Sequence, residues 1–279
     1  MVDINAALIR QLRECTGAGI MECKKVLIEV NGNIDLAIEN MRKSSSVKAL
    51  KKANNIAING IIRLKIFHNY GAILELNCET DFVTKNINFL KFADKLIDAV
   101  GIDPEMDLDT LVKTFEEERI TLVAKIGENI QIKRLSILKG NELGSYLHRD
   151  RIGVLISGFN ISNTLIKNIA MHIAASDPKF IKPENIPINI LEKEYEIQNE
   201  IAIKSSRSHE IAEKIVKGRM KKFKDEISLI GQIFVMDTNK TVNQVLEEQD
   251  AEIIDFIRFE VGEKTIQDIS KVNIGNKNF

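Results

Sequence analysis

Tryptophan is absent from this chain of 279 residues, and aromatic residues make up only 5% of it. The hydrophobic content of 44% therefore depends mainly on Ile, Leu, Val and Ala, and it is enough to bury a core in each of two or three domains. The three cysteines, Cys15, Cys23 and Cys78, form no CxxC pair. Such a small, odd number predicts free thiols in a reducing compartment and argues against a disulfide framework.

An excess of charge of one sign is also lacking, because 39 basic and 40 acidic residues leave a formal net charge of −1. Proteins that bind nucleic acid usually carry a strong basic excess, so this balance disfavours DNA or RNA as a partner. No apolar run approaches the roughly 20 residues that cross a bilayer, and the N-terminus lacks the pattern of a secretory signal. We therefore expect a cytoplasmic protein with no nucleic-acid or membrane partner.

Motifs of familiar catalytic chemistry are missing too: the sequence has no GxxxxGK[ST], GxGxxG, HExxH or GxSxG pattern. The segment TGAG at 16–19 follows a helical pattern instead of a strand and lacks the lysine of a phosphate loop, so it predicts a turn. No histidine has metal-ligand spacing to a cysteine or to another histidine. We expect no enzyme activity, no metal and no cofactor, and we interpret Cys78 as a buried thiol, with a nucleophile as the weaker alternative.

The first 43 residues predict three short helices, near 4–13, 20–30 and 34–43, separated by glycine-containing breaks. Helices this short are marginal alone, so they should pack as a compact bundle. Residues 44–56 place several lysines among Ser, Ala and Asn. We interpret that segment as a charged linker, helical in part, with a nucleic-acid patch as the alternative.

From residue 57 onward the pattern alternates between strands and helices, and its second half repeats the first. Strands are predicted near 58–66, 72–78, 129–138, 144–148, 152–159 and 252–261. Helices are predicted near 89–100, 108–124 and 165–176. We infer two αβ subdomains with antiparallel sheets that are weakly related by internal repetition, the second closed by a delayed strand.

Two further helices, near 190–203 and 210–223, each carry one narrow apolar stripe, which is the spacing of an antiparallel helical hairpin. The stripes are Leu191, Tyr195, Gln198 and Ala202 on one helix, and Ala212, Val216, Met220 and Phe223 on the other. Such a hairpin projects from its domain and offers a surface for a homodimer. The expected class is α+β, divided into a helical bundle at 1–43, a linker at 44–56, subdomains at 57–140 and at 141–183 with 226–263, the hairpin at 184–225, and a tail at 264–279.

The segment ELNCETDFV at 75–83 is the most informative part of the chain. A strand ends there, Thr80 or Asp81 could cap a turn, and Phe82 follows at once. Phe82 either packs back into the core or stands out as an aromatic wedge. A protruding phenylalanine can bury on the order of 150 Å² in a partner, which is typical of a binding hot spot.

Two segments resemble the signatures of the bacterial elongation factor Ts family, namely LRECTGAGIMECKKVL at 12–27 and ELNCETDFV at 75–83. Further similar segments follow in the family's order: GEN at 127–129, YLH at 146–148, IAEKIVKGR at 211–219 and FIRFEVG at 256–262. The resemblance covers nearly the whole chain. It implies that the N-terminal bundle is ubiquitin-associated-like (UBA-like) and that the hairpin is a coiled coil.

The resemblance also implies guanine-nucleotide exchange on GDP-bound elongation factor Tu during translation elongation. The loop Thr80, Asp81, Phe82 and Val83 would remove the support of the GTPase's Mg²⁺, with Asp81 and Phe82 pushing between its helices. The remaining contacts would come from Arg13, Ile20 and Met21 to the nucleotide-binding domain, and from His148 to the third domain.

The chain departs from the family pattern at Thr84, Arg149 and Asp150, where smaller residues are usual, and in the tail 264–279, which does not resemble the usual C-terminal helix. Two other functions compete with exchange. One is an adaptor, or an RNA-binding translation protein, that uses the helical bundle and the basic linker. The other is an enzyme whose catalytic cluster only the fold would bring together.

Overall fold

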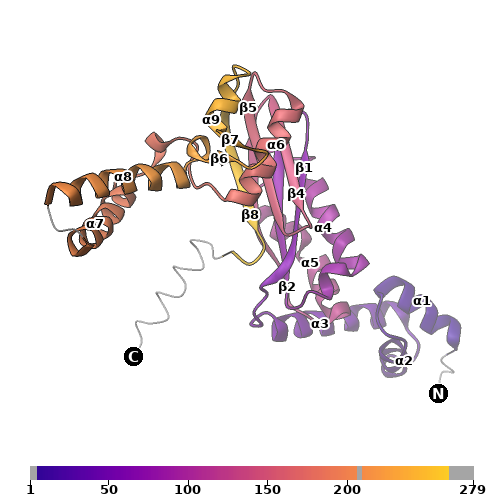
Figure 1. Cartoon of the computed structure of the whole chain (residues 1–279). Helices are drawn as coiled ribbons and strands as arrows, with labels where there is room; N and C mark the ends of the chain where they lie inside the picture. Colours follow the sequence, from indigo (N-terminus) through magenta and orange to yellow (C-terminus); the bar gives the residue numbers. More distant parts are fainter. Residues whose placement is uncertain (1–4, 206–208, 264–279) are drawn as a thin grey trace. The chain divides into compact units, whose positions relative to one another are not determined.

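The protein, seen in a computed structural model, is a mixed α+β fold described over residues 5–205 and 209–263 (Figure 1). The α+β class predicted from the sequence is therefore confirmed. The described residues form two compact units: the first contains 5–65, 73–136 and 259–263, and the second contains 66–72, 137–205 and 209–258. The finer division into six segments stays a prediction, and the tail 264–279 lies outside the described residues.

The first unit begins with three packed helices, α1 (Ala6–Thr16), α2 (Ile20–Glu29) and α3 (Ile34–Lys52). Gly17 ends α1 in the left-handed conformation, at φ 67°, and donates its N–H to the Arg13 carbonyl. The TGAG segment is thus a helix-ending turn, as predicted. The buried core between the three helices consists of Leu12, Cys23, Leu27, Val30, Ala37 and Met41.

Helix α3 is longer than predicted, because it continues from Lys43 through most of the expected linker to Lys52. Serines usually favour turns by competing for backbone groups. Here Ser45 and Ser46 donate their hydroxyls to carbonyls one helical turn earlier, at 2.9 and 3.2 Å, so the helix is not interrupted. Ala49 is buried, and the lysines of the last turn suit the negative end of the helix dipole.

A three-stranded sheet in the order β1 (Asn59–Ile66), β2 (Tyr70–Cys78) and β3 (Ile130–Lys139) follows, with helices α4 (Ile87–Val100) and α5 (Leu108–Ile126) between β2 and β3 in the chain. All nine residues of the central strand β2 are buried. Capping side chains start both helices, Asn86 for α4 and Asp107 for α5. The central strand is therefore a stiff base for the loop that follows Cys78.

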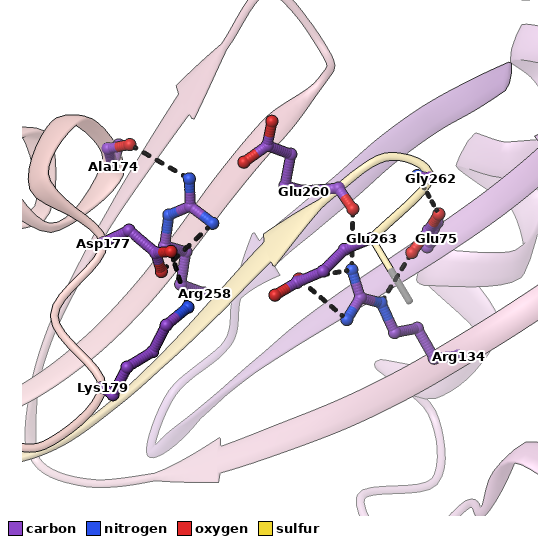
Figure 2. A network of polar contacts seen from close by, with 9 residues as sticks. All are labelled: Glu75, Arg134, Ala174, Asp177, Lys179, Arg258, Glu260, Gly262 and Glu263. Atoms are coloured by element: carbon purple, nitrogen blue, oxygen red, sulfur yellow. Dashed lines mark hydrogen bonds and ion pairs between the residues drawn. The ribbon is translucent and has the colours of Figure 1, made fainter. Parts of the chain in front are cut away.

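A buried ion pair ties β2 to the end of the described chain (Figure 2). Arg134 Nε lies 2.6 Å from Glu75 Oε2, and the Glu75 side chain is fully buried. The other Glu75 oxygen accepts the Gly262 N–H at 3.1 Å. Arg134 also donates to the Glu260 carbonyl and stacks on the Phe259 ring, 3.9 Å from its centroid. Both buried charges thus have partners, which is the condition for tolerating them in a core.

The second unit repeats the plan with β4 (Glu142–His148), β5 (Ile152–Phe159) and β8 (Glu252–Glu260) in that order. Strands β4 and β5 are antiparallel, in register from Glu142–Gly158 to His148–Ile152. Helix α6 (Asn163–Ser176) packs on both of them, and its buried residues form the core with Val154 and Ile156. In both sheets the second strand of the hairpin is central, as internal repetition predicts.

Several short elements were not predicted from the sequence. They are the pair β6 (Ile233–Phe234) and β7 (Asp237–Thr241), the helix α9 (Val242–Glu247), and the 3₁₀ turns η1 (Val83–Lys85), η2 (Pro183–Asn185) and η3 (Leu229–Gly231). None is long enough to display a hydrophobic period. Thr241 and Gln244 nevertheless form a capping box at the start of α9, a signal that could have located it.

Helices α7 (Ile188–Ser205) and α8 (His209–Ile227) pack against each other in the second unit. Their seam is narrower than predicted. Among its described residues, only Ala202, Ala212 and Val216 are buried, whereas Tyr195 is 51% exposed. The coiled-coil geometry and the homodimer stay predictions. In the part of the chain that the structure describes, no helix combines the length and the apolar character needed to span a membrane.

Candidate functional site

The 79–86 loop, which joins β2 to α4, presents the side chain of Phe82 to solvent. Phe82 is 81% exposed, and Asp81 beside it is exposed as well. Large apolar side chains usually contribute to stability by burial, at about 25 cal/mol per Å². Phe82 forgoes that gain, so the interpretation that it packs into its own core is wrong.

Thr80 is held on the near side of Phe82 by both oxygens of one carboxylate. Its backbone N–H donates to Glu128 Oε2 at 2.9 Å, and its hydroxyl donates to Glu128 Oε1 at 2.6 Å. Hydrogen bonds to an ionised acceptor are roughly twice as strong as neutral ones. Gly127 makes this position accessible, since it ends α5 in the left-handed conformation at φ 86° immediately before Glu128.

Glu79, next to Thr80, accepts hydrogen bonds from other segments, whereas Thr80 donates them. Its carboxylate accepts the backbone N–H of Asn129 at 2.6 Å and the side-chain amide of Asn55 at 3.0 Å. The N–H of Asn129 is the main reason why the pKa of Glu79 is lowered, and the Asn55 amide adds to it. The Glu79 carbonyl accepts from the side chain of Asn59 at 2.9 Å. The start of the 79–86 loop is therefore fixed to three other segments of the first unit.

The far side of Phe82 is held by a buried anchor and two local bonds. Val83 is only 6% exposed, so it faces inward as Phe82 faces outward. The Thr84 hydroxyl donates to the Asp81 carbonyl at 2.6 Å, and Asn86 caps α4 through the N–H of Asn88. Thr84, a departure from the family pattern, thus closes the turn instead of disturbing it. A side chain presented in this way loses little conformational freedom when a partner binds it.

Cys78 lies directly beneath the 79–86 loop and is fully buried. Burial, together with the nearby charge of Glu128, raises the pKa of its thiol to about 12. Its Sγ lies 3.1 Å from the Thr80 carbonyl, to which it donates. A thiol in this state is a poor nucleophile, which agrees with the interpretation of Cys78 as an inert buried thiol.

The other predicted contact residues are exposed but are spread over both units. In the first unit, Arg13 lies near the end of α1, and Ile20 and Met21 open α2 with exposures of 54% and 76%. No hydrogen bond or ion pair among the described residues joins these three to the 79–86 loop. His148 belongs to the second unit, where it ends β4, is exposed, and has Nδ1 3.0 Å from the Tyr146 hydroxyl.

The match to a family model covers residues 79–263 and carries the description "Elongation factor TS". Curated proteins named elongation factor Ts from Serratia proteamaculans, Cronobacter sakazakii and Escherichia coli are each 57% identical over 263 residues. Each of these alignments spans 94% of this chain and 93% of the relative. The chain belongs to the elongation factor Ts family. It is a translation elongation factor.

The resemblance that the sequence suggested is thereby confirmed, and the elongation factor Ts match begins at Glu79, the first residue of the loop. The segment GEN at 127–129 resembles the family, but the sequence alone indicates no role for it. In the structure, Glu128 and Asn129 hold the loop. The sequence showed these residues only as a motif, because each lies about 50 residues from its hydrogen-bond partner in the loop. Among residues 5–205 and 209–263, no cluster of His, Cys, Asp and Glu is arranged to bind a metal.

Proposed function

We propose that this protein is a guanine-nucleotide exchange factor that binds GDP-bound elongation factor Tu and promotes release of GDP. The Thr80–Val83 segment inserts into the GTPase, with Asp81 and Phe82 as the inserted side chains. Arg13, Ile20 and Met21 contact the nucleotide-binding domain, and His148 contacts the third domain. The observation that carries the proposal is the exposed Phe82 ring on a loop held from both sides.

The chemistry of the partner explains why a wedge suffices. A GTPase of this type holds GDP with a phosphate loop and with Mg²⁺ bridging phosphate oxygens to protein ligands. Mg²⁺ requires near-ideal octahedral geometry, so a small displacement of the elements that support it weakens its binding sharply. No covalent bond of the nucleotide changes during exchange. The factor therefore needs no general acid, general base, metal or cofactor of its own.

Thermodynamic linkage sets the direction of the effect. A wedge that binds the displaced state of the GTPase more tightly must weaken nucleotide binding, and nucleotide must weaken the wedge by the same factor. Only a difference in affinity between the two states counts, because equal binding to both would shift nothing. A rigid Phe82 supplies such a difference, since it fits only where the GTPase has opened a space for it.

The test is the release of fluorescent GDP from elongation factor Tu, measured with wild-type factor, Phe82→Ala and Asp81→Ala. Truncation of a central hot-spot side chain commonly costs 2 kcal/mol or more, so Phe82→Ala should slow stimulated release by about 30-fold. Asp81→Ala should have a smaller effect in the same direction. Unaltered stimulation by Phe82→Ala would refute the wedge, even though membership in the family would stand.

A matched control comes from the second unit. Phe159 ends β5 and is 65% exposed, so Phe159→Ala removes the same atoms from another exposed position. Stimulation by this variant should equal that of the wild type. The melting temperatures of Phe82→Ala and Phe159→Ala should both stay close to the wild-type value, because neither ring is buried.

A further inference from the structure

The two acidic residues that hold the 79–86 loop form a reciprocal pair of bonds between the end of β2 and the α5–β3 junction. Glu79 accepts the N–H of Asn129, and Glu128 accepts the N–H of Thr80. Glu79 and Thr80, neighbours on one segment, are thus bonded to Asn129 and Glu128, neighbours on the other. Of the two carboxylates, only Glu128 also binds a side chain of the loop, through the Thr80 hydroxyl.

Glu128 belongs to a group of acidic residues whose carboxylates are matched by hydrogen-bond donors. Three acidic groups, Glu79, Asp81 and Glu128, lie around Cys78, and each raises the pKa of its thiol. Backbone N–H groups face the carboxylates of Glu79 and Glu128, and the N–H of Asn129 lowers the pKa of Glu79. Both oxygens of Glu128 are directed at Thr80, two residues before Phe82.

We infer that Glu128 is the positioning residue of the Phe82 wedge. Its carboxylate holds Thr80 by backbone and side chain, so that the loop is ordered before the GTPase arrives. This inference rests on the proposed exchange function and adds a residue that does not itself touch the GTPase. Without Glu128, the loop would become ordered only on binding, and the entropy cost of ordering it would reduce the binding free energy available for exchange.

The chain offers variants that separate positioning from folding. Glu128→Ala removes both acceptors. Glu128→Gln can retain both contacts, because its amide oxygen accepts the Thr80 N–H while its amide nitrogen donates to the Thr80 hydroxyl, which can also act as an acceptor. Thr80→Val removes the hydroxyl and keeps the shape of the side chain. Glu142→Ala is the matched control, since Glu142 accepts a loop N–H, that of Ile161, at 2.9 Å in the second unit.

The decisive measurement combines these variants with Phe82→Ala in a double-mutant cycle on the second-order rate constant of GDP release. Glu128→Ala should lower that constant about tenfold, Glu128→Gln should restore most of it, and Glu142→Ala should leave it unchanged. In a Phe82→Ala background, Glu128→Ala should have no further effect, because the ring it positions is gone. An equal tenfold loss in both backgrounds would overturn the inference, and so would a Gln variant as defective as Ala.

A second readout needs no GTPase. In the free factor, amide hydrogen exchange at Thr80 should be slow in the wild type and in Glu128→Gln, and at least tenfold faster in Glu128→Ala at an unchanged melting temperature. Unchanged protection in Glu128→Ala would overturn the inference by itself. Failure of the wedge is a separate result: Phe82→Ala would then be fully active, whatever Glu128→Ala does to the Thr80 amide.

Discussion

The two sheets of this protein lead from a central strand into a helix by loops of unequal length. In the first unit residues 79–86 connect β2 to α4, and in the second unit residues 160–162 connect β5 to α6. Both loops bury one aliphatic side chain, Val83 at 6% and Ile161 at 8% exposure. Both also donate one backbone N–H to a glutamate, Thr80 to Glu128 and Ile161 to Glu142.

The difference between these loops is that the proposed wedge lies on a stretch that the loop of the second unit lacks. The short loop passes directly from Ile161 to Ser162, which caps α6. The long loop uses the same two anchors and adds a stretch that carries Asp81 and Phe82 outward. Binding residues are concentrated on loops held by a rigid framework, and here the framework is the part that repeats.

The largest expected effect tests how much the stability of the first unit depends on its buried ion pair. Glu75→Gln replaces a fully buried carboxylate that bonds Arg134 and the Gly262 N–H. The new NH₂ group must face one of these two donors, so we expect a loss of about 3 kcal/mol in unfolding free energy. Chemical denaturation, followed by circular dichroism, measures it.

The corresponding change in the second unit is Asp177→Asn, since Asp177 pairs with Arg258 at 3.4 Å but is 41% exposed (Figure 2). Asparagine suits its left-handed backbone, at φ 48°, so the substitution removes the charge and exchanges one acceptor oxygen for an NH₂ group without straining the backbone. A loss below about 1 kcal/mol is expected for so open a pair. Equal losses in the two variants would show that the two units depend on their ion pairs to the same degree.

Elements that depend on residues close together in the sequence were predicted well, whereas features that depend on specific hydrogen bonds were not. Helices such as α4 and strands such as β5 were predicted within two residues at each end, because each carries its own hydrophobic period. The end of α3 was misplaced, since the sequence does not show whether Ser45 and Ser46 bond backwards along the helix. Serine has a low intrinsic helix propensity, but the hydroxyls of these two serines bond within the helix and do not interrupt it.

The candidate site was predicted only in part for the same reason. The motif at 75–83 located the loop, but its pattern left the orientation of Phe82 open between core and solvent. That orientation depends on Glu128, which is 48 residues from Thr80 in the sequence. A single sequence does not reveal a contact at that separation without the fold.

The next largest effect concerns the loss of folding stability at low pH, which should arise from His172 in the second unit. His172 is fully buried, with Nε2 2.8 Å from Gln232 Oε1 and Nδ1 accepting the Val235 N–H. Burial lowers its pKa, although the Gln232 bond opposes the shift. The unfolded state therefore binds the proton more readily. This contribution to stability is complete above the ordinary pKa of about 6.5 and is lost as the pH falls from there through the lowered pKa of the folded state.

Urea denaturation between pH 8 and pH 5 measures this loss, whose slope for one proton is at most about 1.4 kcal/mol per pH unit. His172→Gln should flatten the dependence. The exposed His68, in the β1–β2 hairpin, provides the control, and His68→Gln should keep the wild-type slope. A slope that persists in His172→Gln would assign the acid sensitivity to other groups.

The smallest expected effect has the opposite sign and compares the two hairpin turns. In the β4–β5 turn, Arg149 and Asp150 both have left-handed backbones, at φ 50° and 57°, and the Arg151 N–H donates to the His148 carbonyl at 2.9 Å. That is the geometry of a type I′ turn, whose first central position favours asparagine. An arginine there costs about 1 kcal/mol, so Arg149→Asn should stabilise the protein by about 0.5–1 kcal/mol in thermal unfolding.

The β1–β2 turn at 67–69 shows why the gain should be specific to one position. None of its residues has a positive φ, so asparagine has no conformational advantage there, and His68→Asn should leave stability unchanged or slightly lower. If both asparagine variants gained equally, backbone strain in the β4–β5 turn would not be the cause. If only Arg149→Asn gained, the second sheet would carry a strain next to His148 that the first sheet avoids in its own turn.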